Sequence, residues 1–122
     1  MDLDERIYVT LLLDTYGGLL TERQRTVLHL IYEEDLSLSE IAELTGVSRA
    51  AVLDTKARAE KLLLWYEDAL KVVQSASRRR EALEELNERL EKSMSRLGRD
   101  DPDLVSAARM VKDLLAGELD GL

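Results

Sequence analysis

The sequence predicts an all-α protein, with a compact helical unit over residues 1–73 followed by a helical arm over residues 74–122. Apolar residues make up 45% of the 122-residue chain and charged residues 34%, which suffices for a core and is not the composition of a disordered chain. Phe is absent and Pro occurs once, whereas the helix-favouring residues Leu, Ala, Glu, Arg and Lys are abundant. Neither Gly nor Pro interrupts residues 48–97. These three observations favour helices throughout.

The first helices are predicted from their apolar stripes and from the residues at their ends. A helix is expected over residues 4–16, where a Gly-Gly pair stops it. Thr21 and Gln24 have the spacing of a capping box at the start of a second helix, and Ser37 and Glu40 have the same spacing at the start of a third.

The third and fourth helices are expected to be joined by a tight turn. Gly46 lies where the chain must reverse within about three residues, and a Gly tolerates the positive φ that such a turn often needs. Ser48 is placed to cap the fourth helix. Ala42 is small where the two helices would cross, and Val47 and Val52 would fill the space between them. This spacing predicts a helix-turn-helix without a wing.

The segment that leads from the fourth helix into the arm has two alternative structures. Residues 48–97 could form one helix of about 70 Å, or two helices, because the apolar pattern is weakest at residues 74–77. Gly98 ends this segment, and Asp101 is expected to cap a last helix with Pro102 in its first position. A heptad pattern can be drawn through this segment. The apolar residues at its a and d positions are Leu62, Trp65, Ala69, Val72, Ala76, Leu83, Leu86, Leu90 and Leu97, and we call this row the heptad seam.

This seam predicts a homodimer. A helix of that length cannot be covered by its own short chain, and the last helix can fold back over only part of it. Leu83, Leu86 and Leu90 are therefore the predicted dimer interface, since soluble monomers seldom expose a long apolar strip. In the competing arrangement, the arm bends near residues 75–77 and the C-terminal stripes close into a monomeric bundle.

The charge of the chain argues against strong binding to duplex DNA. The net charge is -8, and residues 1–47 hold three basic residues against ten acidic ones. Phosphate contacts normally supply much of the affinity for DNA. The first turns of the fourth helix expose Ser48, Arg49, Ala50 and Leu53, of which Arg49 alone is a good reader of base edges.

The densest basic cluster lies in the arm, at Arg78, Arg79 and Arg80. It could bind RNA phosphate or an acidic protein surface, and the alternative is a solvated helix face. Farther along, Glu85–Arg89 and Glu88–Lys92 have the spacing of i,i+4 ion pairs. The predicted residues for binding a nucleic acid or a partner are Ser48, Arg49, Ala50, Leu53, Lys56, Arg78, Arg79 and Arg80.

No residue pattern indicates catalysis, a metal or a cofactor. The chain has no Cys, and its single His29 lacks a surrounding set of metal ligands. No nucleophile–base pair and no Gly-rich phosphate loop is present. The aromatic residues Tyr16, Tyr32, Trp65 and Tyr66 are expected to pack in the core. The acidic N-terminus and short apolar runs predict no signal peptide and no membrane span, which fits a cytoplasmic protein.

Residues 12–70 resemble the YlxM family of small bacterial helix-turn-helix proteins. The similar features are Tyr16, Leu20-Thr21-Glu22-Arg23-Gln24, Glu34-Asp35, Leu36-Ser37, Ser39-Glu40-Ile41-Ala42, Val47-Ser48-Arg49, Ala51-Val52, Asp54 and Tyr66-Glu67. The resemblance implies a fold like region 4 of bacterial sigma factors, with a C-terminal helical extension. It also implies a link to the signal recognition particle, because the family is typically encoded beside the genes of the particle's GTPase and its receptor.

The sequence also departs from this family at the fourth helix. Ala50 stands where the family usually has Gln, Leu53 where it has an aromatic residue, Lys56 where it has Ile, and Ala57 where it has Lys. The missing Gln weakens a role in reading bases. Lys56 lies near the core face, so its ammonium group is expected to extend to water.

These observations lead to three hypotheses of function. The first is a non-catalytic regulatory or accessory protein of the signal recognition particle pathway, which binds the particle's protein or RNA through the helix-turn-helix and the basic arm. The second is a DNA-binding transcriptional regulator that acts as a dimer. The third is a dimeric adaptor that binds no nucleic acid.

Overall fold

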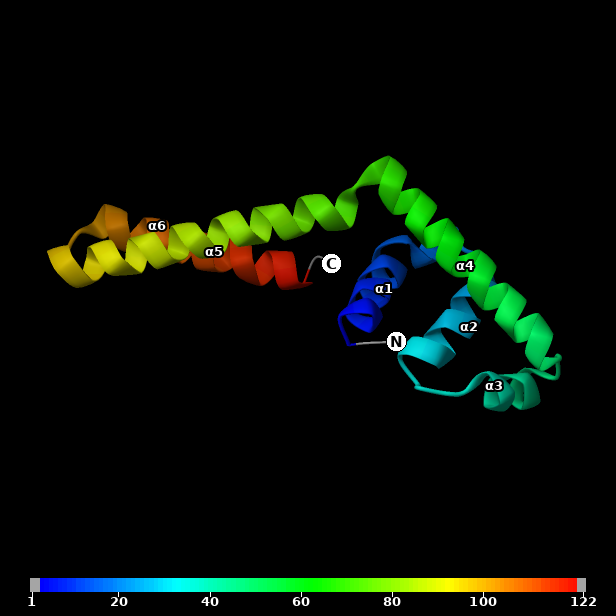
Figure 1. Ribbon diagram of the computed structural model, residues 1–122. Coiled ribbons are helices and arrows are strands. Elements are labelled where there is room, and N and C mark those ends of the chain that lie inside the picture. The colour runs from blue at the N-terminus through cyan, green and yellow to red at the C-terminus, as the bar shows by residue number, and fades with distance from the viewer. Residues whose placement is uncertain (1–2, 121–122) are drawn as a thin grey trace. The chain divides into compact units, whose positions relative to one another are not determined.

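A computed structural model describes the backbone of residues 3–120 and the side chains of residues 3–117. Over these residues the structure is entirely helical (Figure 1), so the predicted all-α class is confirmed. The helices are α1 (Leu3–Tyr16), the 3-10 turn η1 (Gly17–Leu19), α2 (Glu22–Tyr32), α3 (Leu38–Thr45), α4 (Arg49–Leu70), α5 (Val72–Leu97) and α6 (Pro102–Asp120).

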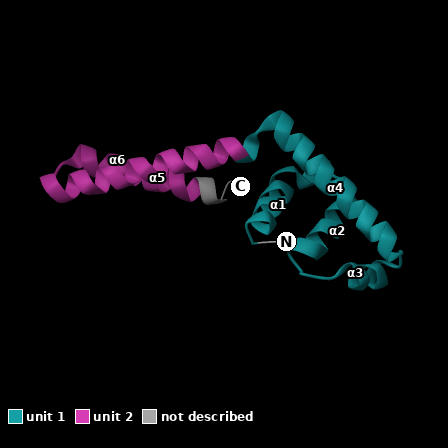
Figure 2. Ribbon diagram, in the orientation of Figure 1, with its two compact units in different colours: residues 1–73 teal, residues 74–122 magenta. Residues whose placement is uncertain are grey.

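The chain divides into two compact units, residues 1–73 and residues 74–122 (Figure 2). The first unit holds α1 to α4 and the first two residues of α5. The second unit holds the rest of α5 together with α6.

The core of the first unit forms where α4 packs against α1, α2 and α3 (Figure 1). Each of the four helices contributes at least one large side chain that is fully buried. Burying such a side chain stabilises the fold by about 1.5–3 kcal/mol. The largest of these side chains belong to Leu12, Leu28, Ile41, Val52 and Leu63.

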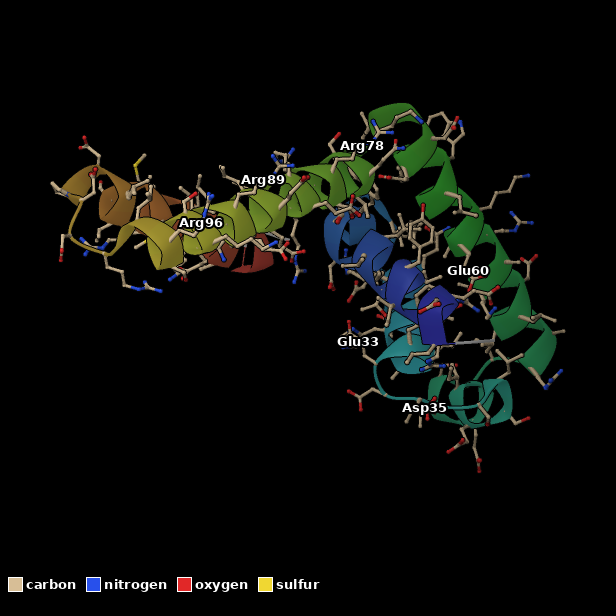
Figure 3. All side chains as sticks on the ribbon, turned by 60° about the vertical axis from the view of Figure 1, so that its left-hand side comes forward. Glu33, Asp35, Glu60, Arg78, Arg89 and Arg96 are labelled. Carbon is tan, nitrogen blue, oxygen red and sulfur yellow. The ribbon has the colours of Figure 1, made fainter. Side chains whose placement is uncertain are left out.

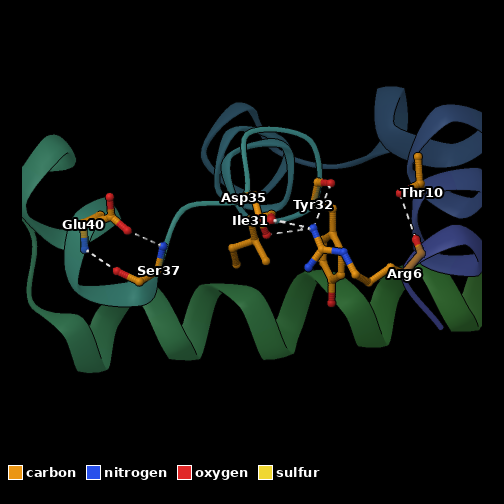
Figure 4. A network of polar contacts seen from close by, with 7 residues as sticks. All are labelled: Arg6, Thr10, Ile31, Tyr32, Asp35, Ser37 and Glu40. Atoms are coloured by element: carbon orange, nitrogen blue, oxygen red, sulfur yellow. Dashed lines mark hydrogen bonds and ion pairs between the residues drawn. The ribbon is translucent and has the colours of Figure 1, made fainter. Parts of the chain in front are cut away.

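Both predicted capping boxes are present. The Thr21 hydroxyl accepts a hydrogen bond from the Gln24 N–H at 3.1 Å, and Gln24 Oε1 accepts one from the Thr21 N–H at 3.0 Å. Ser37 and Glu40 make the same two bonds at 3.1 and 3.0 Å (Figure 4). The hydrogen bond from the Ser37 N–H is the main cause that lowers the pKa of Glu40 below its ordinary value, and the hydrogen bond with the Ser37 side chain adds to this effect.

The C-terminal end of α2 is closed by an arginine from α1. Arg6 Nη2 donates hydrogen bonds to the carbonyls of Ile31 at 3.3 Å and Tyr32 at 3.2 Å (Figure 4). The same atom lies 3.2 Å from the Asp35 carboxylate, and the guanidinium lies 5.5 Å from the centre of the Tyr32 ring. Arg6 thus satisfies carbonyls that a helix end leaves without partners.

The segment of residues 48–97 is two helices, and the break between them is at Lys71. This residue has φ 53° and ψ 33°, a left-handed conformation, after which α5 begins at Val72. The break precedes residues 74–77, where the apolar pattern is weakest. The position of the helix break therefore depends on tertiary interactions, which the apolar pattern of the sequence does not reveal.

Those interactions come from a buried carboxylate and a tyrosine. Glu67 Oε1 accepts hydrogen bonds from the Val73 N–H at 3.1 Å and from the Tyr16 hydroxyl at 2.5 Å, and the same hydroxyl accepts one from the Val72 N–H at 3.1 Å. The first N–H groups of α5 thereby find acceptors inside the fold. Burial, followed by the bond to Glu67, raises the pKa of Tyr16. We refer to Tyr16, Glu67 and the N–H groups of Val72 and Val73 as the junction network.

In the second unit, α6 runs back alongside α5 (Figure 1). Gly98 has a left-handed φ of 90°, and Asp101 Oδ1 accepts hydrogen bonds from the N–H groups of Asp103 and Leu104, as the predicted cap requires. Lys112 on α6 lies 3.1 Å from Glu91 on α5, and this contact, with that from Arg99, lowers the pKa of Glu91. Among the side chains of this unit that the structure describes, those of Ala76, Met94, Ala108 and Val111 are buried.

The predicted aromatic core and the predicted heptad seam are each only partly correct. Tyr16 and Tyr32 are buried as expected and Tyr66 is half-buried, but Trp65 is 63% exposed. The seam assumed one continuous helix, whereas the break at Lys71 changes which face of each helix is covered. Of the predicted interface residues, Leu83 and Leu90 are half-buried and Leu86 is exposed.

Candidate functional site: the exposed face of the helix-turn-helix

The turn between α3 and α4 has the predicted geometry. Gly46 has φ 75° and ψ 18°, and its N–H donates to the Ala42 carbonyl at 2.9 Å. Ser48 caps α4 by accepting a hydrogen bond from the Ala51 N–H at 3.0 Å. Ile41 on α3 and Val52 on α4 are fully buried, so the two helices cross over a packed contact.

Four of the predicted contact residues lie together on the first turns of α4. Ser48, Arg49, Ala50 and Leu53 are all exposed. The Ser48 hydroxyl is engaged as the helix cap, and Ala50 offers no polar group. Arg49 therefore supplies the charge of this surface, which we call the reader face.

Lys56, the fifth predicted contact residue on α4, lies about two turns beyond Arg49 and is engaged in an ion pair. Its side chain is 23% exposed, and its ammonium group lies 3.1 Å from the Glu60 carboxylate. Glu60 also accepts a hydrogen bond from the Tyr32 hydroxyl. Burial is the main cause that raises the pKa of Tyr32, and the bond to Glu60 adds to it. Lys56 thus stabilises the contact of α4 with α2 instead of extending freely into water.

Two carboxylates line a pocket at the neighbouring helix, α3. On α3, Glu40 and Glu43 are exposed and line a shallow pocket with Leu36 and Leu44. Since α3 is the other helix of the motif, a phosphate backbone that followed both helices would meet negative charge. This distribution disfavours non-specific attraction to DNA.

The arginine cluster lies in the second unit, at the start of its part of α5. Arg78, Arg79 and Arg80 are all exposed, and Figure 3 shows Arg78, Arg89 and Arg96 along this helix. Arg80 Nε is 3.0 Å from Glu84 Oε1, so Arg80 has an acidic partner on the next turn.

The ion pairs predicted farther along α5 are present. Arg89 lies 2.7 Å from Glu85, and Lys92 lies 3.7 Å from Glu88. These pairs reduce the positive charge that the later turns of α5 offer to an anion.

One pocket with basic residues was missed by the sequence analysis. It has a volume of about 510 Å³ and is lined by Gln24 of α2 and by four residues of α4, namely Arg58, Lys61, Leu62 and Trp65. The four α4 residues lie at positions i, i+3, i+4 and i+7, which places them on one helical face. This spacing is visible in the sequence and could have indicated a common surface. Trp65 had instead been assigned to the core.

Neither a metal site nor a membrane span is found in the described part of the chain. Among the side chains of residues 3–117, no three from His, Cys, Asp or Glu are grouped as metal ligands. His29 is exposed, and its Nδ1 lies 3.0 Å from Glu33. No helix over these residues is both long and apolar enough to cross a membrane.

The packed α3–turn–α4 element and its exposed reader face define a helix-turn-helix protein. Comparison with known families agrees with this class. The chain belongs to the UPF0122 family, whose model carries the description "Putative helix-turn-helix protein, YlxM / p13 like" and matches residues 3–99. The match extends from α1 to α5 and ends before α6.

Curated relatives support the same membership. A UPF0122 protein of Clostridium acetobutylicum is 44% identical over 88 residues, which cover 72% of this chain and 76% of the relative. One from Clostridium kluyveri is 54% identical over 72 residues, covering 59% and 65%. One from Desulforamulus reducens is 50% identical over 78 residues, covering 64% and 67%.

Proposed function

We propose that this protein is a non-catalytic regulatory or accessory factor of the signal recognition particle pathway, acting in the cytoplasm. It docks onto the particle's RNA or its GTPase through the reader face and the arginine cluster. The link to this pathway comes from the YlxM resemblance. The structural support is a well-packed helix-turn-helix whose exposed surface is poorly suited to duplex DNA.

The observation that carries this proposal is the charge of the helix-turn-helix surface. Arg49 is the cation of the reader face, Lys56 is held by Glu60, and α3 exposes Glu40 and Glu43. A protein that neutralises few phosphates has a small electrostatic contribution to DNA affinity at physiological salt. The motif therefore retains its packing while its surface serves another ligand.

A second candidate function is that of a DNA-binding transcriptional regulator acting as a dimer. Arg49 favours it, because it is exposed on the first turn of α4, where recognition helices contact base edges. If this function were correct, Arg49→Ala should weaken binding to the preferred duplex by about 1–3 kcal/mol and relax sequence preference.

A binding comparison tests the proposal. The full chain is titrated against particle RNA, the particle's GTPase and random duplex DNA at physiological salt. We expect the RNA or the GTPase to bind better than the DNA. Simultaneous Arg78→Glu, Arg79→Glu and Arg80→Glu should weaken that binding, whereas Arg89→Glu, on the same helix but paired with Glu85, should change it much less. Tight, sequence-specific DNA binding that survives the triple substitution would contradict the proposal.

A further inference from the structure

The pocket beside Trp65 combines an aromatic wall with two cations. Arg58, Lys61, Leu62 and Trp65 line it from α4, and Gln24 lines it from α2. Its volume of about 510 Å³ lies within the range of about 300–1,000 Å³ that is usual for ligand pockets.

The Trp65 indole is held in place although it is exposed. Its ring packs edge-on against Tyr66, with centroids 5.4 Å apart and planes at 64°, and the Tyr66 ring lies 6.0 Å from that of buried Tyr16. This aromatic row connects the exposed indole to the core. A ring that is already ordered loses little entropy when another ring stacks on it.

The wall of the pocket is mainly apolar, and its two charged residues are both basic in a chain that is strongly negative. Arg58 and Lys61 line it, and no carboxylate does. By contrast, Glu40 and Glu43 line the pocket beside Leu44. The pocket therefore suits a ligand that presents both an apolar ring and negative charge.

The polar groups of the pocket are able to engage such a ligand. Within the described part of the chain, Lys61 makes no ion pair. Arg58 is paired with Asp54 at 3.0 Å, but both side chains are exposed, and exposed pairs contribute little. Gln24 Oε1 is occupied by the Thr21 N–H, which leaves the amino group as the remaining hydrogen-bonding group of this side chain.

We propose that this pocket binds one unpaired nucleotide of a single-stranded RNA, with the base against the Trp65 indole and the phosphate at Arg58 and Lys61. Stacking on aromatic side chains beside cations is the usual way in which proteins hold unpaired bases. The inference rests on the proposed docking to the particle's RNA, and it adds the type of RNA element that is recognised. A duplex, whose bases are already stacked and paired, does not fill the pocket.

The site is independent of the reader face. Arg58 follows Arg49 by nine residues along α4, which corresponds to a rotation of about 180° around the helix axis. Arg49 and Arg58 therefore lie on opposite sides of α4, and Lys61 lies about three helical turns beyond Ala50, so substituting Arg49 leaves both cations of the pocket unchanged.

The chain's single tryptophan gives a direct test. The full chain is titrated with an octamer of adenylate, with a blunt RNA duplex and with adenosine monophosphate, while Trp65 fluorescence is recorded. We expect the octamer to quench the fluorescence and the duplex to leave it unchanged. If adenosine monophosphate quenches the fluorescence as strongly as the octamer at the same nucleotide concentration, the ligand of the pocket is a free nucleotide. If it quenches less than the octamer, the ligand is a nucleotide within an RNA strand.

Substitutions then separate stacking from charge, with binding followed by the anisotropy of labelled octamer. Trp65→Ala should weaken binding about tenfold, whereas Trp65→Phe should retain most of it. Arg58→Gln with Lys61→Gln should also weaken binding and reduce its salt dependence. The matched control is Arg89→Gln, because Arg89 is 75% exposed and paired with Glu85, as Arg58 is 74% exposed and paired with Asp54.

Two results of the octamer titrations would overturn the inference. One is an octamer that neither quenches Trp65 nor loses affinity in the Trp65→Ala variant. The other is quenching by the particle's GTPase without quenching by the octamer, which would identify the pocket as a protein contact. If particle RNA binds and depends on Arg78, Arg79 and Arg80 but not on Trp65, the inference fails while the proposed function stands.

Discussion

The substitution Tyr16→Phe removes a single oxygen atom from the junction network. That oxygen donates a hydrogen bond to Glu67 Oε1 at 2.5 Å and accepts one from the Val72 N–H at 3.1 Å. A hydrogen bond to a charged group contributes about 1.5–3 kcal/mol, and a donor left without a partner adds a desolvation cost of about 1–3 kcal/mol when it is fully buried. Since Val72 is exposed, the second cost is small, and we expect Tyr16→Phe to lower the free energy of unfolding of the first unit by about 2–4 kcal/mol.

Urea denaturation of the full chain measures this change. Trp65 is the single tryptophan and lies in the first unit, so its fluorescence reports the unfolding of that unit. The phenyl ring of the variant retains the packing of Tyr16 against Tyr66, which isolates the contribution of the hydroxyl. The midpoint should fall at an unchanged slope.

Tyr8→Phe is the matched control for Tyr16→Phe. It removes the same hydroxyl from a tyrosine on the same helix, but Tyr8 is 40% exposed and donates no hydrogen bond within the described part of the chain. We expect Tyr8→Phe to change the free energy of unfolding by less than about 0.5 kcal/mol. If Tyr16→Phe were equally mild, the junction network would not stabilise the fold as argued.

Two further predictions concern the turn and the arm. Gly46→Val should destabilise the first unit by more than about 1 kcal/mol, because a β-branched residue resists the positive φ. A Cβ at this position would meet open space, so backbone strain is the main cost of a substitution. Gly46→Asn should therefore destabilise the unit less than Gly46→Val, because Asn tolerates a positive φ. Equal urea midpoints for the wild type and both variants would contradict this prediction. The chain should also be a homodimer joined through the arm, where Leu86 on α5 and Met110 on α6 remain exposed. Sedimentation equilibrium should give a dimer mass that Leu86→Asp with Met110→Asp converts to a monomer without altering the fluorescence of the first unit; a wild-type monomer at tens of micromolar would refute the dimer.

Local signals were sufficient for the helix ends and for the turn. Capping boxes join residues three positions apart, and the left-handed Gly46 depends on its own backbone. The Asp101 cap likewise bonds to N–H groups two and three residues away. Such interactions are written in a short stretch of sequence, so the helix-turn-helix and the start of α6 could be predicted correctly.

The sequence did not determine the break at Lys71 or the exposure of Trp65. No Gly or Pro marks Lys71, and its conformation is accompanied by a hydrogen bond between Tyr16 and Glu67, which are 51 residues apart. A heptad pattern assumes that the helix continues, so it placed Trp65 and Leu86 in one covered seam. Which side chains become buried depends instead on which helix packs against each face. The sequence therefore determined the helix-turn-helix, whereas the tertiary structure decided where the helix after it breaks and which aromatic ring remains exposed.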